Sequence, residues 1–356
     1  MKKISVPRLA LTYAGCFLGA GYVSGQELWQ FFGTFGLWGL VGLLLALSFM
    51  MSFSVLLIRL VQRTGIVEMD RIVVPWEMPW LRNICAVLEV VGLFGVAVIM
   101  VAGAGALLSK LFPVPVWLGC AVFALVVMLV SAKGLSGMVM SFSLTVPVLV
   151  GATVLFAAVA AIKNGGNFVL PTSNASENPL LGSWILSALS FVGYNLFGSI
   201  GILSPIGSYV EKRGTAEKGV SLGSVFLLLI ALSVLFAMLL MPETVGEELP
   251  MLSAALELFP LGGYCYGALL LFAMFGTALS TLVAVFTYFE LHFPKAKKYR
   301  SPMAAVGGIA LFAGSLVGFG DLIGVIYPLF GYAGSVFLVL VLIHSLQRKR
   351  SDENGK

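Results

Sequence analysis

Charged residues are scarce in this chain, at 10% of its 356 residues. Soluble domains carry about 25% charged residues, so water is not the solvent of most of this surface. Histidine is rarer still, and His292 and His344 cannot form a metal site by themselves. The scarcity of charge therefore excludes an ordinary soluble domain.

Cysteine occurs only four times, in apolar segments and without CxxC spacing, at Cys16, Cys85, Cys120 and Cys265. We expect small buried hydrophobic residues rather than disulfide partners or metal ligands. The sequence also lacks an HExxH motif and a His/Asp/Glu metal cluster. We therefore predict no catalytic residues, no enzyme activity and no cofactor other than a coupling ion.

Long apolar stretches dominate the composition, and the mean hydropathy is +1.03. Four charge-free stretches, at 33–58, 134–162, 219–242 and 258–289, exceed the ~20 residues of a membrane-spanning helix. No secretory cleavage site follows the N-terminal residues, so the first helix should stay in the membrane. We predict an all-α polytopic membrane protein with ten transmembrane helices, at 8–32, 37–61, 83–109, 115–132, 138–162, 183–210, 219–241, 261–291, 302–319 and 322–346.

The Lys and Arg residues indicate the orientation. With both termini in the cytoplasm, only Lys110 and Lys163 fall outside, and all the others fall inside. This predicts a multi-pass protein of the bacterial inner membrane with cytoplasmic N- and C-termini. The net charge of +5 then faces anionic lipid. We expect the lipid bilayer and a small-molecule solute as partners, and no nucleic acid.

Two connecting segments carry structure-forming patterns. The segment 62–82 is cytoplasmic and holds Trp76 and Trp80, which suits an interfacial position. The segment 242–261 is outside, acidic at first and then apolar across 251–259. It could form a short lid helix or an ordinary surface loop.

Two glycine-rich interruptions are the most informative feature. The first, Gly19-Ala20-Gly21-Tyr22-Val23-Ser24-Gly25-Gln26-Glu27, lies in the first span. The second, Gly193-Tyr194-Asn195-Leu196-Phe197-Gly198-Ser199, lies in the sixth. Paired interruptions at corresponding places in two halves point to the midplane binding site of a secondary transporter built from repeats.

Each interruption has a structural alternative. Gly15, Gly19, Gly21 and Gly25 could serve close helix packing. Against this stand Ser24, Gln26 and Glu27, because an intramembrane carboxylate is expensive and indicates function. In the second interruption, Tyr194 and Asn195 could bond a polar ligand, or Tyr194 could belong to a packed core. Pro205 follows and cannot continue the hydrogen-bond ladder.

Candidate cation sites lie in the eighth and third spans. Thr277, Ser280 and Thr281 share one helical face and could complete an oxygen cage for Na⁺. Such hydroxyls more often bond their own i−4 carbonyl. Glu89, in the third span, could carry a proton, pair with a neighbouring helix, or snorkel to the inner interface. Tyr327-Pro328 in the tenth span is interpreted as a kink.

The GxGxxxGQE run from Gly19 to Glu27, followed by Phe31-Phe32, resembles the YkvI-like family of bacterial membrane proteins. These are permeases of the amino acid–polyamine–organocation superfamily. The resemblance implies the leucine-transporter-like fold, a 5+5 inverted repeat with helices 1 and 6 broken at the substrate site. The corresponding repeats here are 8–162 and 183–346 within one transporter domain, with 347–356 as a cytoplasmic tail.

The resemblance also implies roles for individual residues. Gly19 and Gly21 match the glycines of the first break, and Gly15 and Leu18 fall where family carbonyls face a sodium ion. Ser280 and Thr281 match the paired hydroxyl residues of helix 8, with Thr277 one turn earlier. Two features depart from the pattern: helix 5 lacks the lysine of proton-coupled relatives, and Gln26-Glu27 puts a carboxylate near the break, which favours a cationic group.

The resulting prediction is a cation-coupled secondary transporter of a small polar solute, most simply an amino acid or related amine, working by alternating access. The expected substrate-binding residues are Gly19, Gly21, Ser24, Gly25, Gln26, Glu27, Gly193, Tyr194, Asn195 and Ser199. The expected Na⁺ site is Gly15, Leu18, Thr277, Ser280 and Thr281, and the proton-coupling candidates are Glu27 and Glu89. The alternative is a ligand-binding receptor or signalling subunit that keeps the fold without transport.

Overall fold

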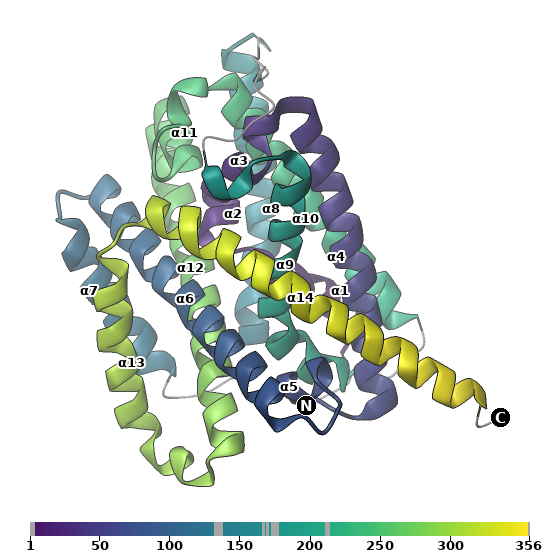
Figure 1. Ribbon diagram of the computed structural model, residues 1–356. Helices are drawn as coiled ribbons and strands as arrows, with labels where there is room; N and C mark the ends of the chain where they lie inside the picture. Colours follow the sequence, from purple (N-terminus) through teal and green to yellow (C-terminus); the bar gives the residue numbers. More distant parts are fainter. Residues whose placement is uncertain are drawn as a thin grey trace.

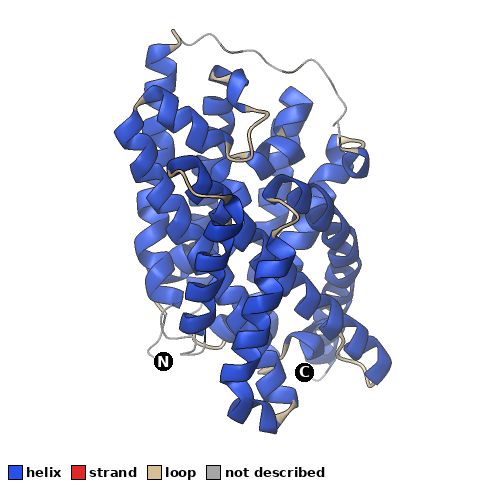
Figure 2. Cartoon of the chain, turned by 90° about the vertical axis from the view of Figure 1, so that its left-hand side faces the viewer, coloured by secondary structure: helices blue, strands red, loops and turns tan. Residues whose placement is uncertain are grey.

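The computed structural model of the protein describes residues 4–131, 138–165, 168, 171, 178–210 and 214–354. Over these residues the chain is helical and contains no strand (Figure 2). Figure 1 shows the helices packed side by side, with both chain ends toward the end of the bundle that carries the short helix α5 (Met69–Val73). The short helix α11 (Pro250–Leu258) lies at the opposite end.

Helix cores coincide with all ten predicted spans. The first span contains three short helices, α1 (Val6–Phe17), α2 (Ala20–Ser24) and α3 (Gln26–Phe31), and the 3₁₀ turn η1 (Gly33–Phe35) follows it. The other nine are α4 (Gly36–Thr64), α6 (Pro79–Leu111), α7 (Val116–Ser131), α8 (Met138–Lys163), α9 (Trp184–Gly207), α10 (Thr215–Leu240), α12 (Pro260–His292), α13 (Arg300–Ser315) and α14 (Phe319–Asn354). Shorter 3₁₀ turns are η3 (Pro179–Leu181), η4 (Pro242–Thr244) and η5 (Pro294–Tyr299).

Local sequence signals begin and end several of these helices. Proline starts α6, α11 and α12 at the first helical position, where its missing N–H has no intrahelical partner to lose. Gly65 ends α4 in the left-handed region, at φ 69°.

The outer surface of the bundle is apolar. Large hydrophobic side chains such as Leu45, Val306 and Ile309 are exposed on α4 and α13. Within the described residues, seven helical segments are long and apolar enough to cross a membrane, and the shorter apolar helices α7 and α13 add to them. This confirms a multi-pass membrane protein, while the count of ten spans stays a prediction.

The two halves of the chain pack in related ways. In the first half, α1 packs against α10 and α8. In the second half, α9 packs against α4 and α14. These are equivalent pairs if helices 1–5 correspond to helices 6–10, as the inverted repeat requires. The boundaries 8–162 and 183–346 stay predictions.

The predicted interruption of the sixth span is not found. Helix α9 runs without a break from Trp184 to Gly207, through Gly193 and Pro205. Gly193 serves close packing instead, because a Cβ there would overlap the carbonyl oxygen of Gly331 on α14. A Cβ at Gly334 would in turn overlap the Gly193 carbonyl. Close helix packing, which was the structural alternative for the glycines of the first span, thus applies to Gly193 in the sixth span.

Two smaller expectations also have outcomes. The segment 242–261 forms a helix, α11, and its apolar residues Met251 and Leu252 are buried.

Cys85 and Cys120 are buried as expected, whereas Cys265 is exposed on α12. The expectation of burial was wrong for Cys265 because an apolar neighbourhood in the sequence does not distinguish a lipid-facing position from the core.

Candidate functional site

The first span breaks at an inverse γ-turn centred on Leu18. Its φ and ψ are −80° and 71°, and the Gly19 N–H donates to the Phe17 carbonyl at 2.9 Å. In a continuous helix this N–H would donate to Gly15. The turn therefore withdraws the helical donor from the Gly15 carbonyl and places the Leu18 carbonyl between α1 and α2.

A second discontinuity follows at Gly25. This residue ends α2 and begins α3 with φ 90°, a left-handed conformation that glycine adopts without steric cost. The Gln26 N–H donates to the Ser24 hydroxyl at 3.4 Å across this bend. The chain from Leu18 to Gln26 is thus a short helical piece with a turn at each end.

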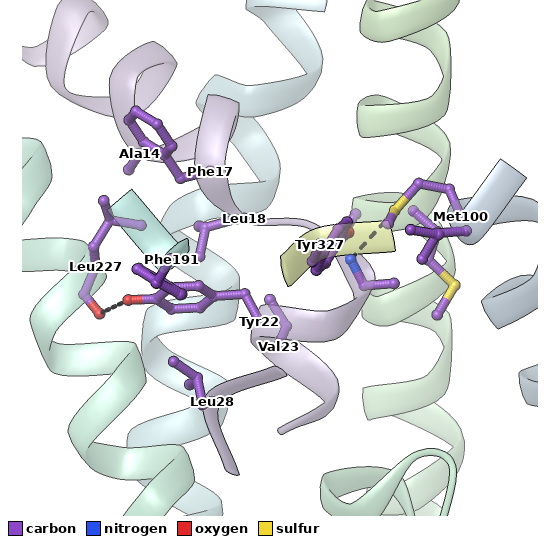
Figure 3. Close-up of a cluster of buried hydrophobic side chains, with 14 of the residues drawn as sticks. Ala14, Phe17, Leu18, Tyr22, Val23, Leu28, Met100, Phe191, Leu227 and Tyr327 are labelled. Carbon is purple, nitrogen blue, oxygen red and sulfur yellow. Dashed lines mark hydrogen bonds between the residues drawn. The ribbon is translucent and has the colours of Figure 1, made fainter. Parts of the chain in front are cut away.

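Neighbouring helices hold this piece through its polar groups (Figure 3). The Tyr22 hydroxyl donates to the Leu227 carbonyl of α10 at 2.9 Å. The Ala20 N–H, which begins α2, donates to the Met100 sulfur at 3.3 Å. On the other side, the Tyr266 hydroxyl of α12 donates to the Val23 carbonyl at 2.7 Å. Helices far apart in the sequence therefore fix the geometry of the break.

Glu27 lies directly over the break and is 2% exposed. A Cβ at Gly21 would come 2.8 Å from the Glu27 Oε2, so glycine at this position makes room for the carboxyl group. The Tyr194 hydroxyl of α9 donates to the Glu27 Oε1. The structure therefore brings Gly21, Glu27 and Tyr194 together, and their role in substrate binding stays a prediction.

Aromatic rings enclose this carboxyl group on the α9 and α14 side. Tyr194 stacks on Tyr327 with a centroid distance of 4.3 Å and an interplanar angle of 10°. Phe31 and Phe191 each lie 5.7 Å from the Tyr194 ring. From the sequence, Tyr327 was interpreted only as part of a kink with Pro328. An aromatic residue next to a proline within a span was the signal that could have pointed to Tyr327 as a site residue.

Other predicted substrate residues lie in different settings. Asn195 is beside the Glu27 carboxyl, although its amide donates to the Phe191 carbonyl at 3.0 Å. Ser199 is one turn further along α9, and its hydroxyl donates to Leu196 at 2.8 Å. Gly193 faces α14 rather than the break. Gln26 lies on the other side of α3, at the wall of an outer pocket.

That outer pocket opens at the α11 end and has a volume of about 510 Å³. Its polar lining includes Gln26, Gln30, Glu247, Glu248 and Asp321. Glu247 forms an ion pair with Lys110 at 2.6 Å. The pocket reaches Gln26 and Gln30 of α3, and Gln26 is the residue before Glu27.

The candidate Na⁺ residues are partly brought together. The Thr277 hydroxyl of α12 donates to the Leu18 carbonyl at 3.4 Å, so the eighth span does face the break. Ser280 and Thr281 donate to the Thr277 carbonyl at 3.0 and 2.9 Å, which is the helix-internal bonding weighed in the sequence. The oxygen atoms of these two hydroxyl groups still have lone pairs that could bind a cation.

Glu89 is fully buried in α6, so snorkelling to the interface is wrong for this residue. Its Oε1 accepts a hydrogen bond from the Gly201 N–H of α9 at 3.1 Å, and its Oε2 has no hydrogen-bond partner among the described residues. Glycine at position 201 permits this approach, since a Cβ there would lie 3.1 Å from Oε1. Glu89 thus pairs with a neighbouring helix, one of the roles that the sequence left open.

Solved membrane transporters share this architecture. The structure of MhsT in complex with L-phenylalanine matches with a TM-score of 0.71 and 17% identity, covering 96% of this chain and 89% of that one. A substrate-bound, outward-open Na⁺-coupled sialic acid symporter matches with a TM-score of 0.68 and 11% identity, over 95% and 78%. Mhp1, a nucleobase-cation-symport-1 family transporter, matches with a TM-score of 0.64 and 15% identity, over 91% and 75%. The chain has the leucine-transporter-like fold.

Two relatives are similar over the whole length. The membrane protein YkvI of Bacillus subtilis is 25% identical over 354 residues, which is 98% of this chain and 99% of YkvI. The Bacillus subtilis protein YyaD is 26% identical over 347 residues, which is 95% of this chain and 96% of YyaD. No family model matches the chain. The full-length similarity confirms the resemblance to the YkvI-like membrane proteins.

Proposed function

We propose that this protein is a proton-coupled secondary transporter of an amino acid or a related small amine, working by alternating access. The observation that carries the proposal is the buried Glu27 carboxyl, which lies against Gly21 at the break of the first span. Non-helical backbone at membrane depth is tolerated beside protein or a water-filled cavity, and it often marks the solute site of a transporter.

The chemistry of the site supports a solute with an ammonium group and an apolar part. A carboxylate attracts the ammonium group, and the rings of Tyr194 and Tyr327 offer faces that also attract cations. The outer pocket adds Glu248 and Asp321, which would raise the local concentration of cationic solutes. MhsT in complex with L-phenylalanine has the same fold, so L-phenylalanine is the first probe to try.

Two carboxyl groups support protons as the coupling ion. Glu27 and Glu89 are both buried. Among the described residues, no Lys or Arg forms an ion pair with either of them. An unpaired buried carboxylate is costly, and binding a proton removes that cost. A proton taken up at Glu27 from the outside would be displaced toward the inside when the ammonium group of the solute binds there, so the proton and the solute move in the same direction.

Sodium is the second candidate coupling ion. The contact between Thr277 and the Leu18 carbonyl supports it, because both offer the hard oxygen ligands that such a cation needs. The Gly15 carbonyl, deprived of its helical donor, would be a third ligand. The similarity in fold to a Na⁺-coupled sialic acid symporter supports the same alternative.

The orientation follows from charge. We assign the end that carries α5 and η5 to the cytoplasm of a bacterial inner membrane, because nearly all Lys and Arg lie in segments at that end. Both termini are then cytoplasmic, 347–356 is the cytoplasmic tail, and the outer pocket faces the exterior. We retain 8–162 and 183–346 as the two repeats.

The test is uptake of labelled amino acids, beginning with L-phenylalanine, into proteoliposomes under an inward pH gradient or an inward Na⁺ gradient. We expect accumulation driven by the pH gradient, and we expect Glu27→Gln to abolish it while the protein stays folded. Glu257→Gln, which removes an exposed carboxyl group on α11, is the matched control. Accumulation driven only by the Na⁺ gradient would mean that Na⁺, and not the proton, is the coupling ion. Binding without uptake would support the receptor alternative.

A further inference from the structure

A second group of buried titratable side chains lies between Glu27 and the α5 end of the bundle. The carboxyl of Glu89 on α6 lies nearest to the candidate site. Asp70 of α5 is 6% exposed, and within the part of the chain that the structure describes its Oδ1 has no hydrogen-bond partner. Two buried carboxyl groups in one region, each with an unbonded oxygen, call for an explanation beyond packing.

A small cavity connects Glu89 to the candidate site. Its volume is about 20 Å³, and its wall includes Glu89, Tyr194 and Tyr327, with the remainder apolar or glycine. A cavity of this size has room for about one water molecule, and Glu89 and Tyr194 would be its polar partners. Tyr194 itself donates to Glu27. The Tyr194 hydroxyl and space for one water molecule therefore connect the carboxyl groups of Glu27 and Glu89.

The other side of Glu89 leads toward solvent. Asp70 and Glu89 lie on neighbouring helices, because α5 packs against α6. The Asp70 Oδ2 lies 3.8 Å from the Nε2 of His292 on α12, and the His292 side chain is 34% exposed. The series of carboxyl groups thus ends at His292, whose side chain water can reach.

Every helix around Glu89 contributes to its electrostatic surroundings. The titratable and charged groups on this side are Cys85 of α6, Glu68, Asp70 and Arg71 in and beside α5, Arg82 near the start of α6, Tyr194 of α9, Tyr288 and His292 of α12, and Tyr327, His344 and Arg348 of α14. Two of the arginines at this end bond other groups: Arg71 pairs with Glu68 at 3.6 Å, and Arg82 donates to the carbonyls of Val74 and Pro75.

We propose that Glu89 is a second proton-binding site, and that Tyr194, the cavity, Glu89, Asp70 and His292 form a proton route from Glu27 to the α5 end of the bundle. This proposal rests on the proposed proton-coupled transport. Before each transfer the Tyr194 hydroxyl, which donates to Glu27 in the structure, rotates to donate to the cavity water. The Glu27 carboxyl then gives its proton to the Tyr194 oxygen as the tyrosine releases its own hydroxyl proton to that water. The water passes a proton to the Glu89 carboxylate, so neither the tyrosine nor the water keeps a charge.

The route explains three observations together. The unbonded Oε2 of Glu89 and Oδ1 of Asp70 are free to accept protons. The glycines at positions 92 and 198 line the cavity and leave its space open. The position of α5 against α6 and α14 brings Asp70 into the bundle although it belongs to a connecting segment.

The first test needs no solute. Infrared spectra of the purified protein in lipid nanodiscs report the carbonyl stretch of protonated carboxyl groups, and transfer to D₂O shifts this band where the proton exchanges. We expect a buried band that shifts in D₂O, that is lost in Glu89→Gln and that is kept in Glu89→Asp. Glu77→Gln, at an exposed position before α6, should leave it unchanged. A Glu89→Gln spectrum identical to that of the unmodified protein would overturn the proposal.

The second test separates the route from transport itself. In proteoliposomes, Glu89→Gln should still exchange internal for external amino acid, while accumulation driven by the pH gradient is lost. Full proton-driven accumulation by Glu89→Gln would refute the route and leave the proposed transport standing. Absence of proton-driven accumulation in the unmodified protein would instead refute the proposed coupling. Loss of both exchange and accumulation, with an unchanged infrared band, would assign Glu89 a structural role.

Discussion

Two glycine-rich segments look alike in the sequence and fold differently. From Leu18 to Gln26 the first span leaves the helix twice, at the γ-turn of Leu18 and at the left-handed Gly25. The corresponding segment of α9 stays helical through Gly193 and Gly198. The same residue type therefore serves backbone conformation in one place and close helix approach in the other.

The partners of each segment explain the difference. Around the break, side chains bond the backbone of the chain: Tyr266 holds the Val23 carbonyl, and Met100 accepts from the Ala20 N–H. Around Gly193, the neighbour is backbone, namely the Gly331 carbonyl of α14. Glycine frees backbone groups only where other groups satisfy them, and otherwise it simply lets two helices touch.

The largest effect should come from Gly193→Ala. The added methyl group would overlap the carbonyl oxygen of Gly331 and lie 2.6 Å from the Ser335 hydroxyl. Backbone atoms cannot move aside as a flexible side chain can, so α9 and α14 must separate. We expect a loss of about 3 kcal/mol of stability, or failure to accumulate in the membrane, measured by thermal melting of the detergent-solubilised protein.

Gly198→Ala is the matched control, because it adds the same methyl group to the same helix with nothing within 4 Å of it. It should melt like the unmodified protein. Equal melting of Gly193→Ala and Gly198→Ala would mean that close packing does not explain the glycine of α9.

A smaller effect is expected for Gly25→Ala. An alanine at φ 90° is strained by about 1–2 kcal/mol, and its methyl group would also meet the Met238 sulfur at 2.6 Å. Because α3 carries Glu27, the strain should reduce uptake more than it reduces the melting temperature. Gly19→Ala is the control within the same break, since its Cβ would make an ordinary 3.5 Å contact with Met100. If both variants transport alike, the left-handed turn is not needed for the site.

Sequence alone was sufficient for the parts that depend on composition and local pattern. Charge-free stretches located the helices, and Gly25 followed by Glu27 located the break, because polar groups there have no local reason to be in a membrane. The apolar run at 251–259 left a short helix and a surface loop open, and the structure has the helix α11. These signals lie within one segment and need no knowledge of its neighbours.

The remaining features depend on residues far apart in the chain. Whether Gly193 bends its helix or packs closely is decided by Gly331, 138 positions away in the sequence. The burial of Glu89 depends on the Gly201 N–H of α9, and the stacking of Tyr327 depends on Tyr194. A pattern within one helix carries no information about which neighbour will face it.

The first span opens at the proposed solute site, whereas α9 remains a continuous helix. Hydrogen–deuterium exchange of the purified protein tests it most directly, comparing peptides that cover 18–27 and 190–201, with and without the amino acid that accumulates in proteoliposomes. We predict fast exchange at the break, slowed by the solute, and slow exchange in α9 under both conditions. Equal exchange of the two segments, or a solute effect confined to α9, would contradict the account.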